Sequence, residues 1–185
     1  MRNVKAIVDH LHCAQSKLLR AADAVPAERW ATRPSPEAWS AAELIAHLIM
    51  VERTIVGHAD RIRTKPPRPI PFLKRLHLPM ALVESRLIRR KTPIPLDTNM
   101  VREKEQMLAE LREVRERSLA FLTETREQDL RKFCWPHPFL GMLNTYEWFK
   151  MIGSHEIRHT KQMNEIASNL PKLVATGQKR DEFTN

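Results

Sequence analysis

The stretch "GSHEIRHTKQMNEI", residues 153–166, decides the fold, because its letters fit two different structures. They contain His-Glu-x-x-His, the string of zinc proteases, and they also place apolar residues at helical spacing. A helix turns by about 100° per residue, so Ile152, His159 and Met163 all fall within about 80° of His155. Both histidines therefore lie in the middle of an apolar stripe, and the stretch favours a helix that faces a protein core.

A protease needs more than this string. Zinc proteases complete the histidine pair with a downstream ligand and pack the helix under a β-sheet that holds the substrate. The glutamates downstream of the string are Glu165 and Glu182, Arg158 stands inside it, and the chain shows no convincing strand. We therefore do not expect this protein to hydrolyse peptides.

Helical spacing recurs along the rest of the chain. The sequence predicts helices over residues 3–22, 40–63, 97–127 and 145–167. In the second of these, "WSAAE" provides a capping box of Ser40 and Glu43. In the third, which Asp97 or Thr98 would cap, we interpret the glutamates and arginines between the apolar residues as a solvated face. The fold class predicted is all-α, a four-helix bundle.

The connection between the second and third helices is long, basic and rich in proline. Residues 64–96 contain "PPRPIP" and "PIP", with a possible short helix broken at Pro79. A tight antiparallel turn does not need so many residues, so we predict a crossover and an up-down-down-up bundle. The 185 residues are predicted to form a single domain, residues 1–185, ending in a frayed tail, "GQKRDEFTN".

Composition limits the classes of function. No apolar run is long enough to cross a membrane, and the two cysteines suggest reduced thiols, so we expect a soluble cytoplasmic protein. The net charge of +9 is concentrated in residues 65–91 and would attract phosphates. However, no zinc-finger or RNA-binding motif accompanies it, and Tyr146 is the sole tyrosine. A module that binds nucleic acid or an acidic partner through the crossover remains an alternative.

The second helix carries a third core-facing histidine. His47 shares a stripe with Leu44, Val51 and Ile55. Three buried imidazoles need partners, and one divalent metal ion held by His47, His155 and His159 would satisfy all three, with a water in the fourth position. Alternatively, each ring is hydrogen-bonded separately. His58 shares the stripe but lies about 16 Å from His47 along the helix, so only one of the two can join such a site.

Several motifs resemble, in order and spacing, the DinB-like family of bacterial helical-bundle proteins. They are "WSAAELIAHLIMVE", "HPFLGMLNTYEW" and "SHEIRHTKQMNEI", and they cover most of the chain except residues 64–96. The residues that carry the pattern are Trp39, Ser40, Glu43, His47, Leu48, Glu52, His155, Arg158, His159 and Gln162. The resemblance implies His47 rather than His58 as the third ligand, a nickel or zinc ion held by the three histidines, and frequent homodimers.

Some members of that family are transferases or isomerases that use low-molecular-weight thiols such as bacillithiol or mycothiol. The resemblance therefore implies a metal-dependent enzyme acting on a small-molecule substrate, a thiol-dependent transferase or a hydrolase. A bound ion would lower the pKa of a thiol or water so that it attacks an electrophile. A dimeric bundle that binds metal without turnover is a further alternative.

Three residues near the histidines are candidates for catalysis. Glu156 is either a proton acceptor or a surface or outer-sphere residue. Arg158 and Gln162 either orient ligands and an anionic substrate or, in the case of Arg158, form an ion pair with Glu52. Trp148 and Trp135 are interpreted as core and pocket wall.

Overall fold

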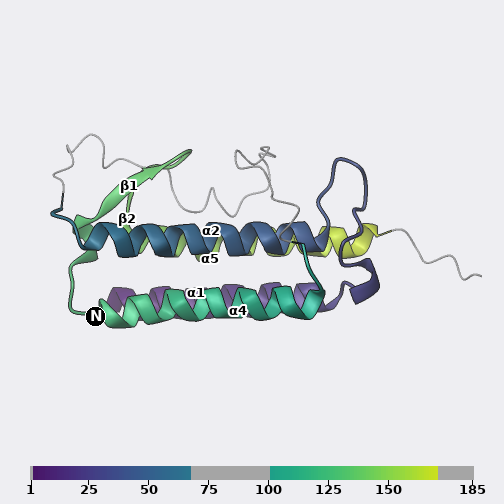
Figure 1. Ribbon diagram of the computed structural model, residues 1–185, viewed down its shortest axis with the longest axis horizontal. Coiled ribbons are helices and arrows are strands. Elements are labelled where there is room, and N and C mark those ends of the chain that lie inside the picture. The colour runs from purple at the N-terminus through teal and green to yellow at the C-terminus, as the bar shows by residue number, and fades with distance from the viewer. Residues whose placement is uncertain (1, 68–100, 171–185) are drawn as a thin grey trace, which may run out of the picture.

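Four long helices form the body of the protein in a computed structural model that describes residues 2–67 and 101–170. They are α1 (Arg2–Asp23), α2 (Ala41–Arg63), α4 (Lys104–Glu124) and α5 (Thr145–Asn169). Figure 1 shows α1 and α5 running in one direction and α2 and α4 in the other, with α1 and α4 in one layer and α2 and α5 in the next. The predicted up-down-down-up bundle is confirmed.

Capping boxes fix where α2 and α5 begin. Ser40 Oγ accepts from the Glu43 N–H, and the Glu43 carboxylate accepts from the Ser40 N–H at 2.8 Å. Asn144 and Glu147 repeat this arrangement at the start of α5. Since the first residue of a helix sets the direction of every later side chain, these boxes determine which way the histidines of both helices face.

The third long helix starts later than the sequence predicted. The N-cap of α4 is Glu103, and residues 101–103 are not helical. Residues 97–100, the short helix predicted in the crossover and the predicted tail at residues 177–185 all lie outside the described residues.

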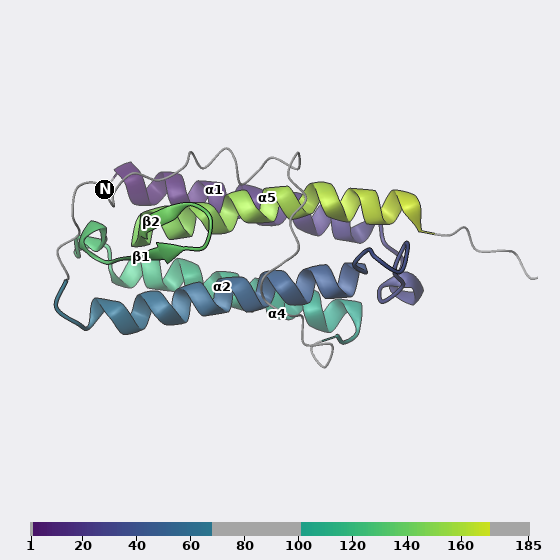
Figure 2. The ribbon, with the colours of Figure 1, turned by 90° about the horizontal axis from the view of Figure 1, so that it is seen from above.

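A β-hairpin stands where the sequence indicated only a loop, so the expectation of no strand was wrong. Strands β1 (Cys134–His137) and β2 (Gly141–Asn144) are antiparallel and pair from Cys134↔Asn144 to His137↔Gly141. Gly141 has φ 89°, a conformation that glycine tolerates best. Figures 1 and 2 place the hairpin on the outer face of the α2–α5 layer, over α5.

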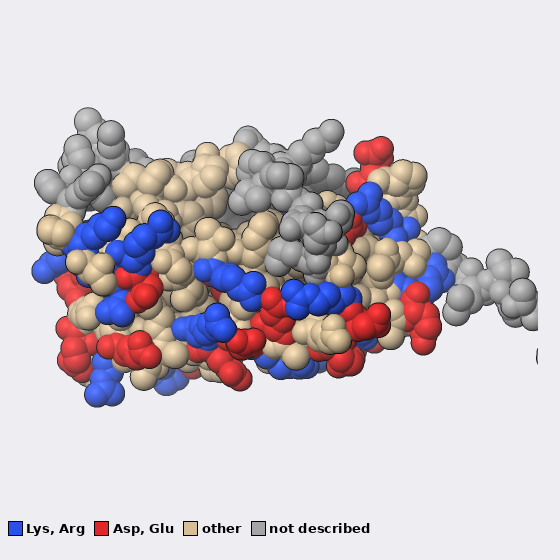
Figure 3. Space-filling view, in the orientation of Figure 1, with Lys and Arg blue, Asp and Glu red and all other residues tan. Residues whose placement is uncertain are grey.

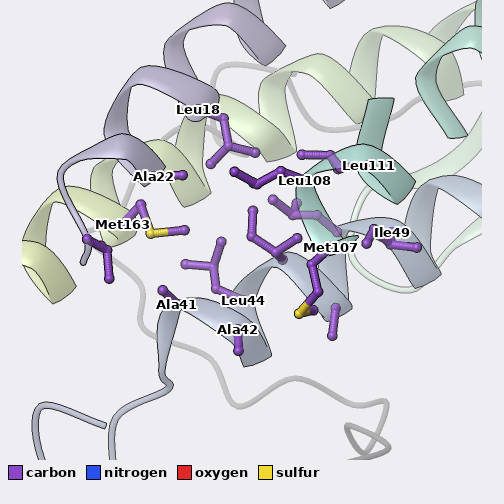
Figure 4. Close-up of a cluster of buried hydrophobic side chains, with 14 of the residues drawn as sticks. Leu18, Ala22, Ala41, Ala42, Leu44, Ile49, Met107, Leu108, Leu111 and Met163 are labelled. Carbon is purple, nitrogen blue, oxygen red and sulfur yellow. The ribbon is translucent and has the colours of Figure 1, made fainter. Parts of the chain in front are cut away.

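The apolar core consists of two clusters, one towards each end of the bundle. The cluster in Figure 4 joins all four helices and includes Leu18, Leu44, Leu111 and Met163. The second cluster lies towards the other end, under the hairpin, and includes Ile7, Ile55, Leu122, Leu143, Trp148 and Phe149. Most of the buried polar and charged residues of the site described below lie between the two clusters along their helices, namely Glu52 of α2, Arg115 and Ser118 of α4, and Glu156 and His159 of α5.

The outer surface carries charges of both signs. Figure 3 shows Lys and Arg interspersed with Asp and Glu on one face, and ion pairs such as Arg53–Glu110 and Arg117–Glu113 are part of this mixture. Most of the basic crossover lies outside the described residues. Among the described helices, none combines the length and the apolar character that a membrane span requires.

Helices α1 and α5 approach each other closely at Gly153. A Cβ atom added there would lie 2.4 Å from Cδ2 and 2.5 Å from Nε2 of His10. These distances are too short for any side chain at this position unless the His10 ring moves. The absence of a side chain at Gly153 therefore lets the His10 ring pack directly on the backbone of α5.

We expect Gly153→Ala to be less stable than Gly57→Ala. A Cβ at Gly57, on α2, meets nothing within 4 Å, so alanine there should gain about 0.5–1 kcal/mol from helix propensity. Alanine at Gly153 must displace His10, at a cost of about 1–3 kcal/mol. Urea unfolding measures both variants. In a His10→Ala background Gly153→Ala should regain the helical benefit, and equal stability of the two alanine variants without that change would contradict the close contact.

Candidate metal centre

Three histidine side chains from two helices meet in the middle of the bundle. His47 Nε2 lies 3.4 Å from His155 Nε2, which lies 3.1 Å from His159 Nε2. One ligand nitrogen from each residue lies within 4.8 Å of the other two. Because α2 and α5 run antiparallel, residues 108 positions apart in the chain come together here, as the sequence predicted.

Hydrogen bonds alone do not satisfy this cluster. The Nε2 atom of a neutral imidazole carries either one proton or one lone pair, so His155 Nε2 can make a good hydrogen bond with only one of its two nitrogen neighbours. A cation at the centre would accept a lone pair from each of the three rings. The convergence of three Nε2 atoms therefore fits a metal ion better than it fits three separately bonded rings.

The spacing also suits a first-row metal. At a metal–nitrogen distance of about 2.0–2.1 Å, two ligand nitrogens are about 2.9 Å apart at right angles and about 3.4 Å apart at tetrahedral angles. The two measured separations, 3.1 and 3.4 Å, fall within this range. Imidazole ligands suit both nickel and zinc.

Burial opposes protonation of His47 and His155, which leaves the lone pairs of these two rings available. Burial lowers the pKa of His47 to about 4. Burial also lowers the pKa of His155 well below its ordinary value, and a positive charge on any of four neighbours acts in the same direction, on His159, His47, Arg158 or His137. Metal ions bind the deprotonated ring, so a buried cluster of this kind is ready for a cation without first losing protons.

Neighbouring side chains orient the ligand rings. His159 Nδ1 lies 3.0 Å from Gln162 Oε1, so its N–H donates to the amide oxygen and leaves Nε2 unprotonated. Trp39 stacks on His159 with an interplanar angle of 8° and also contacts His47. His47 Nδ1 is buried and has no hydrogen-bond partner within the described part of the chain. Gln162 thus contacts the second nitrogen of the His159 ring, and its role in orienting a metal ligand stays a prediction.

A buried ion cluster joins all four helices beside the histidines. Arg115 of α4 donates to both carboxylate oxygens of Glu52 at 2.8 and 3.0 Å, to Glu156 at 2.9 Å and to the Leu11 carbonyl at 2.5 Å. Ser118 Oγ donates to Glu52 at 2.6 Å. Burial alone would lower the pKa of Arg115, but the two carboxylates raise it, so the arginine stays charged.

The structure corrects two interpretations of the sequence. Arg115 does not belong to a solvated face, because its side chain is only 1% exposed. Measured from Leu111, Arg115 falls at about 40°, within the apolar stripe, so the spacing used for the histidines would have identified it. Glu52 forms its ion pair with Arg115 rather than with Arg158.

Glu156, predicted as a proton acceptor or a surface residue, is fully buried. Its Oε2 accepts from Arg115, while its Oε1 has no partner within the described residues. Burial raises its pKa to about 7, with the Glu52 charge in the same direction and Arg115 opposing. A surface role is therefore excluded, and a group that titrates near neutrality adjoins His155 in the chain.

Arg158, a candidate for catalysis, and His58, the alternative third ligand, both lie outside the group of three histidines. Arg158 is half-buried on α5, and its charge contributes to the lowered pKa of His155. His58 lies apart from the three histidines, against Trp135 of the hairpin. The structure therefore places His47, and not His58, beside His155 and His159, and the assignment of His47 as a metal ligand stays a prediction.

The fold and the site together define a class of protein, the up-down-down-up helical bundles with three histidines gathered between the second and the last helix. A family model described as the DinB superfamily matches residues 10–163. The chain is 30% identical over 146 residues to "Uncharacterized protein YuaE" of Bacillus subtilis (strain 168). The aligned residues make up 78% of this chain and 87% of that protein. The chain belongs to the DinB superfamily, and the resemblance seen in its motifs is confirmed. No solved structure matches it.

Proposed function

We propose that this protein is a metal-dependent enzyme acting on small molecules, a thiol-dependent transferase or a hydrolase. The observation that carries the proposal is the convergence of three histidine Nε2 atoms whose rings cannot all be satisfied by one another. Membership of the DinB superfamily supports it. The proposal includes a cytoplasmic location, which the composition suggests, and a homodimer, which the family resemblance suggests.

The residues would divide the work as follows. His47, His155 and His159 would hold nickel or zinc, and Gln162 would fix the His159 ring. Once bound, the ion would supply Lewis-acid chemistry by lowering the pKa of a thiol or a water. Glu156, with its raised pKa and its unpaired Oε1, would take up the proton released, and Arg158 would attract an anionic substrate or thiol.

Elemental analysis of protein purified without an affinity tag tests the metal site. We expect about one nickel or zinc per chain, and a rise in melting temperature when the ion is returned to chelator-treated protein, because a ligand that binds only the folded state stabilises it. Protein without bound metal, whose melting temperature does not respond to either ion, would contradict the proposal.

Turnover separates an enzyme from a bundle that only binds metal. Cobalt-substituted protein should change its visible spectrum when bacillithiol, mycothiol or cysteine is added, if a thiol joins the three histidines. Conjugation of the responding thiol to an aryl chloride acceptor would then be measured with and without the metal. A spectral change without metal-dependent conjugation or hydrolysis would favour the non-catalytic alternative.

A further inference from the structure

Besides the three clustered histidines, the hairpin carries a histidine, His137, and backbone hydrogen bonds determine which of its ring nitrogens holds the proton. His137 is the last residue of β1, and its Nδ1 accepts hydrogen bonds from the N–H groups of Phe139 and Leu140 at 3.1 and 3.2 Å. A nitrogen that accepts two backbone N–H groups is unprotonated. In the neutral ring the proton therefore sits on Nε2, on the side of the imidazole away from the turn.

Aromatic neighbours hold this ring in place. Its centroid is 5.1 Å from that of Trp148, and Phe139 meets it edge to face at 6.0 Å. Trp148 in turn stacks on Trp135 at 4.9 Å, and its Nε1–H donates to the Trp135 carbonyl at 3.2 Å. The imidazole is thus attached to a rigid aromatic wall, in which Trp135 is half-buried and Trp148 is buried behind it in the core.

This wall lies close to the three clustered histidines. Trp148 is two helical turns before His155 on the same stripe of α5, about 10 Å along the axis, and Figure 2 shows the hairpin lying over α5. The charge of His137 is among those that lower the pKa of His155. A small planar molecule could therefore contact the hairpin at one end and reach the histidine cluster at the other.

Among the residues that the structure describes, the Nε2–H of His137 has no acceptor. No hydrogen bond in the described residues uses this atom, whereas both backbone N–H groups at Nδ1 are satisfied. The ring is half-buried, and a partly buried donor that is held rigid and unpaired is suited to a ligand, because binding supplies the missing hydrogen bond.

We propose that His137 is a substrate-positioning residue, whose Nε2–H donates to an oxygen acceptor of a planar aromatic or conjugated substrate lying against the half-buried Trp135 of the aromatic wall. A carbonyl or carboxylate oxygen provides such an acceptor, and the flat ring system matches the aromatic wall. The reacting end of that substrate is placed at the metal by the proposed function, on which this part rests. The hydrogen bond itself requires no metal.

Two substitutions of His137 test the roles of the two ring nitrogens separately. In His137→Asn the side-chain oxygen can still accept from the turn N–H groups, as Nδ1 does, but nothing replaces Nε2–H. In His137→Gln the longer amide can place an N–H near Nε2, but the turn loses its acceptor. His12→Asn, at an exposed position of α1, is the matched control.

Benzoate serves as the probe, because it joins a flat ring to an acceptor carboxylate. Its dissociation constant is measured at pH 8 from tryptophan fluorescence, with the protein as purified and again after treatment with chelator. We expect His137→Asn to weaken benzoate binding by at least about tenfold, the usual loss for a hydrogen bond to a charged group. His137→Gln and His12→Asn should stay within about threefold of the unmodified protein, and acetate, which lacks the ring, should bind more weakly than benzoate.

The outcomes distinguish this inference from the proposed function. A purely structural role for His137 predicts the reverse order, with His137→Gln impaired and His137→Asn unaffected, and that result would overturn the proposal. Equal binding by all variants, or no benzoate binding to the unmodified protein, would overturn it as well. A protein that takes up no metal but shows the expected order in the chelator-treated sample would remove the proposed function and leave the His137 site standing.

Discussion

Replacing His155 by alanine is expected to abolish stoichiometric binding of nickel or zinc. His155 Nε2 is the common neighbour of the other two ligand nitrogens, so its loss leaves two histidines on different helices. Changes to residues that only orient a ligand reduce metal affinity by about 10–100-fold, and removal of a ligand should exceed about a hundredfold. Competition with a chromophoric chelator measures the affinity, and the melting temperature of the metal-free variant establishes that it is folded.

His12→Ala is the control for this experiment, because His12 is an exposed histidine outside the cluster. It should bind one ion with unchanged affinity. If His155→Ala retained tight stoichiometric binding, the ion would have to be held elsewhere, and the three-histidine centre would be wrong. If both variants lost the metal equally, the loss would reflect a general effect on the protein.

Replacing Arg115 by methionine is expected to destabilise the protein by about 3–5 kcal/mol. The substitution leaves Glu52 and Glu156 buried without their cation, and an uncompensated buried charge carries a cost of this size. For a chain of this length the melting temperature should fall by roughly 10 °C. Thermal and urea unfolding at pH 7 measure the change.

Two comparisons make this prediction specific. Arg117→Met, which removes an exposed arginine of the same helix, should change stability by less than about 0.5 kcal/mol. Adding Glu52→Gln and Glu156→Gln to Arg115→Met should recover much of the loss, because the stranded charges are then gone. A triple variant less stable than Arg115→Met would show that the cluster contributes through hydrogen-bond geometry rather than through charge.

The sequence predicted the histidine cluster because its information is local. The capping boxes at Ser40 and Asn144 fix the phase of α2 and α5, and helical geometry then places His47, His155 and His159 on facing stripes. Distance along the helix left His47 and His58 as alternatives. Only the axial alignment of α2 with α5 decides between them, and that alignment depends on packing between helices.

Three other features of the structure could not be predicted from the sequence, and each has an identifiable physical reason. Arg115 was assigned to the surface because charged residues on a helix are usually solvated, although its position in the apolar stripe contradicted this. The hairpin is two four-residue strands containing Pro136, where periodicity is too short to detect and proline argues against a strand. His137 was not singled out, because its meaning depends on a hydrogen bond to the turn that only the folded chain forms.

The charged layer between the two apolar clusters has a consequence for how the centre is assembled. Apolar contacts alone tolerate a helix sliding along its neighbour, whereas Arg115 reaches Glu52 and Glu156 together at only one axial offset of α2 and α5. Glu156 adjoins His155, and Glu52 stands little more than one turn beyond His47. The same offset that completes the ion cluster therefore also brings the three imidazoles together, edge to face. A slip of a single residue, about 1.5 Å, would leave a buried charge without its partner, so the ion cluster also fixes how far the three imidazoles lie from one another.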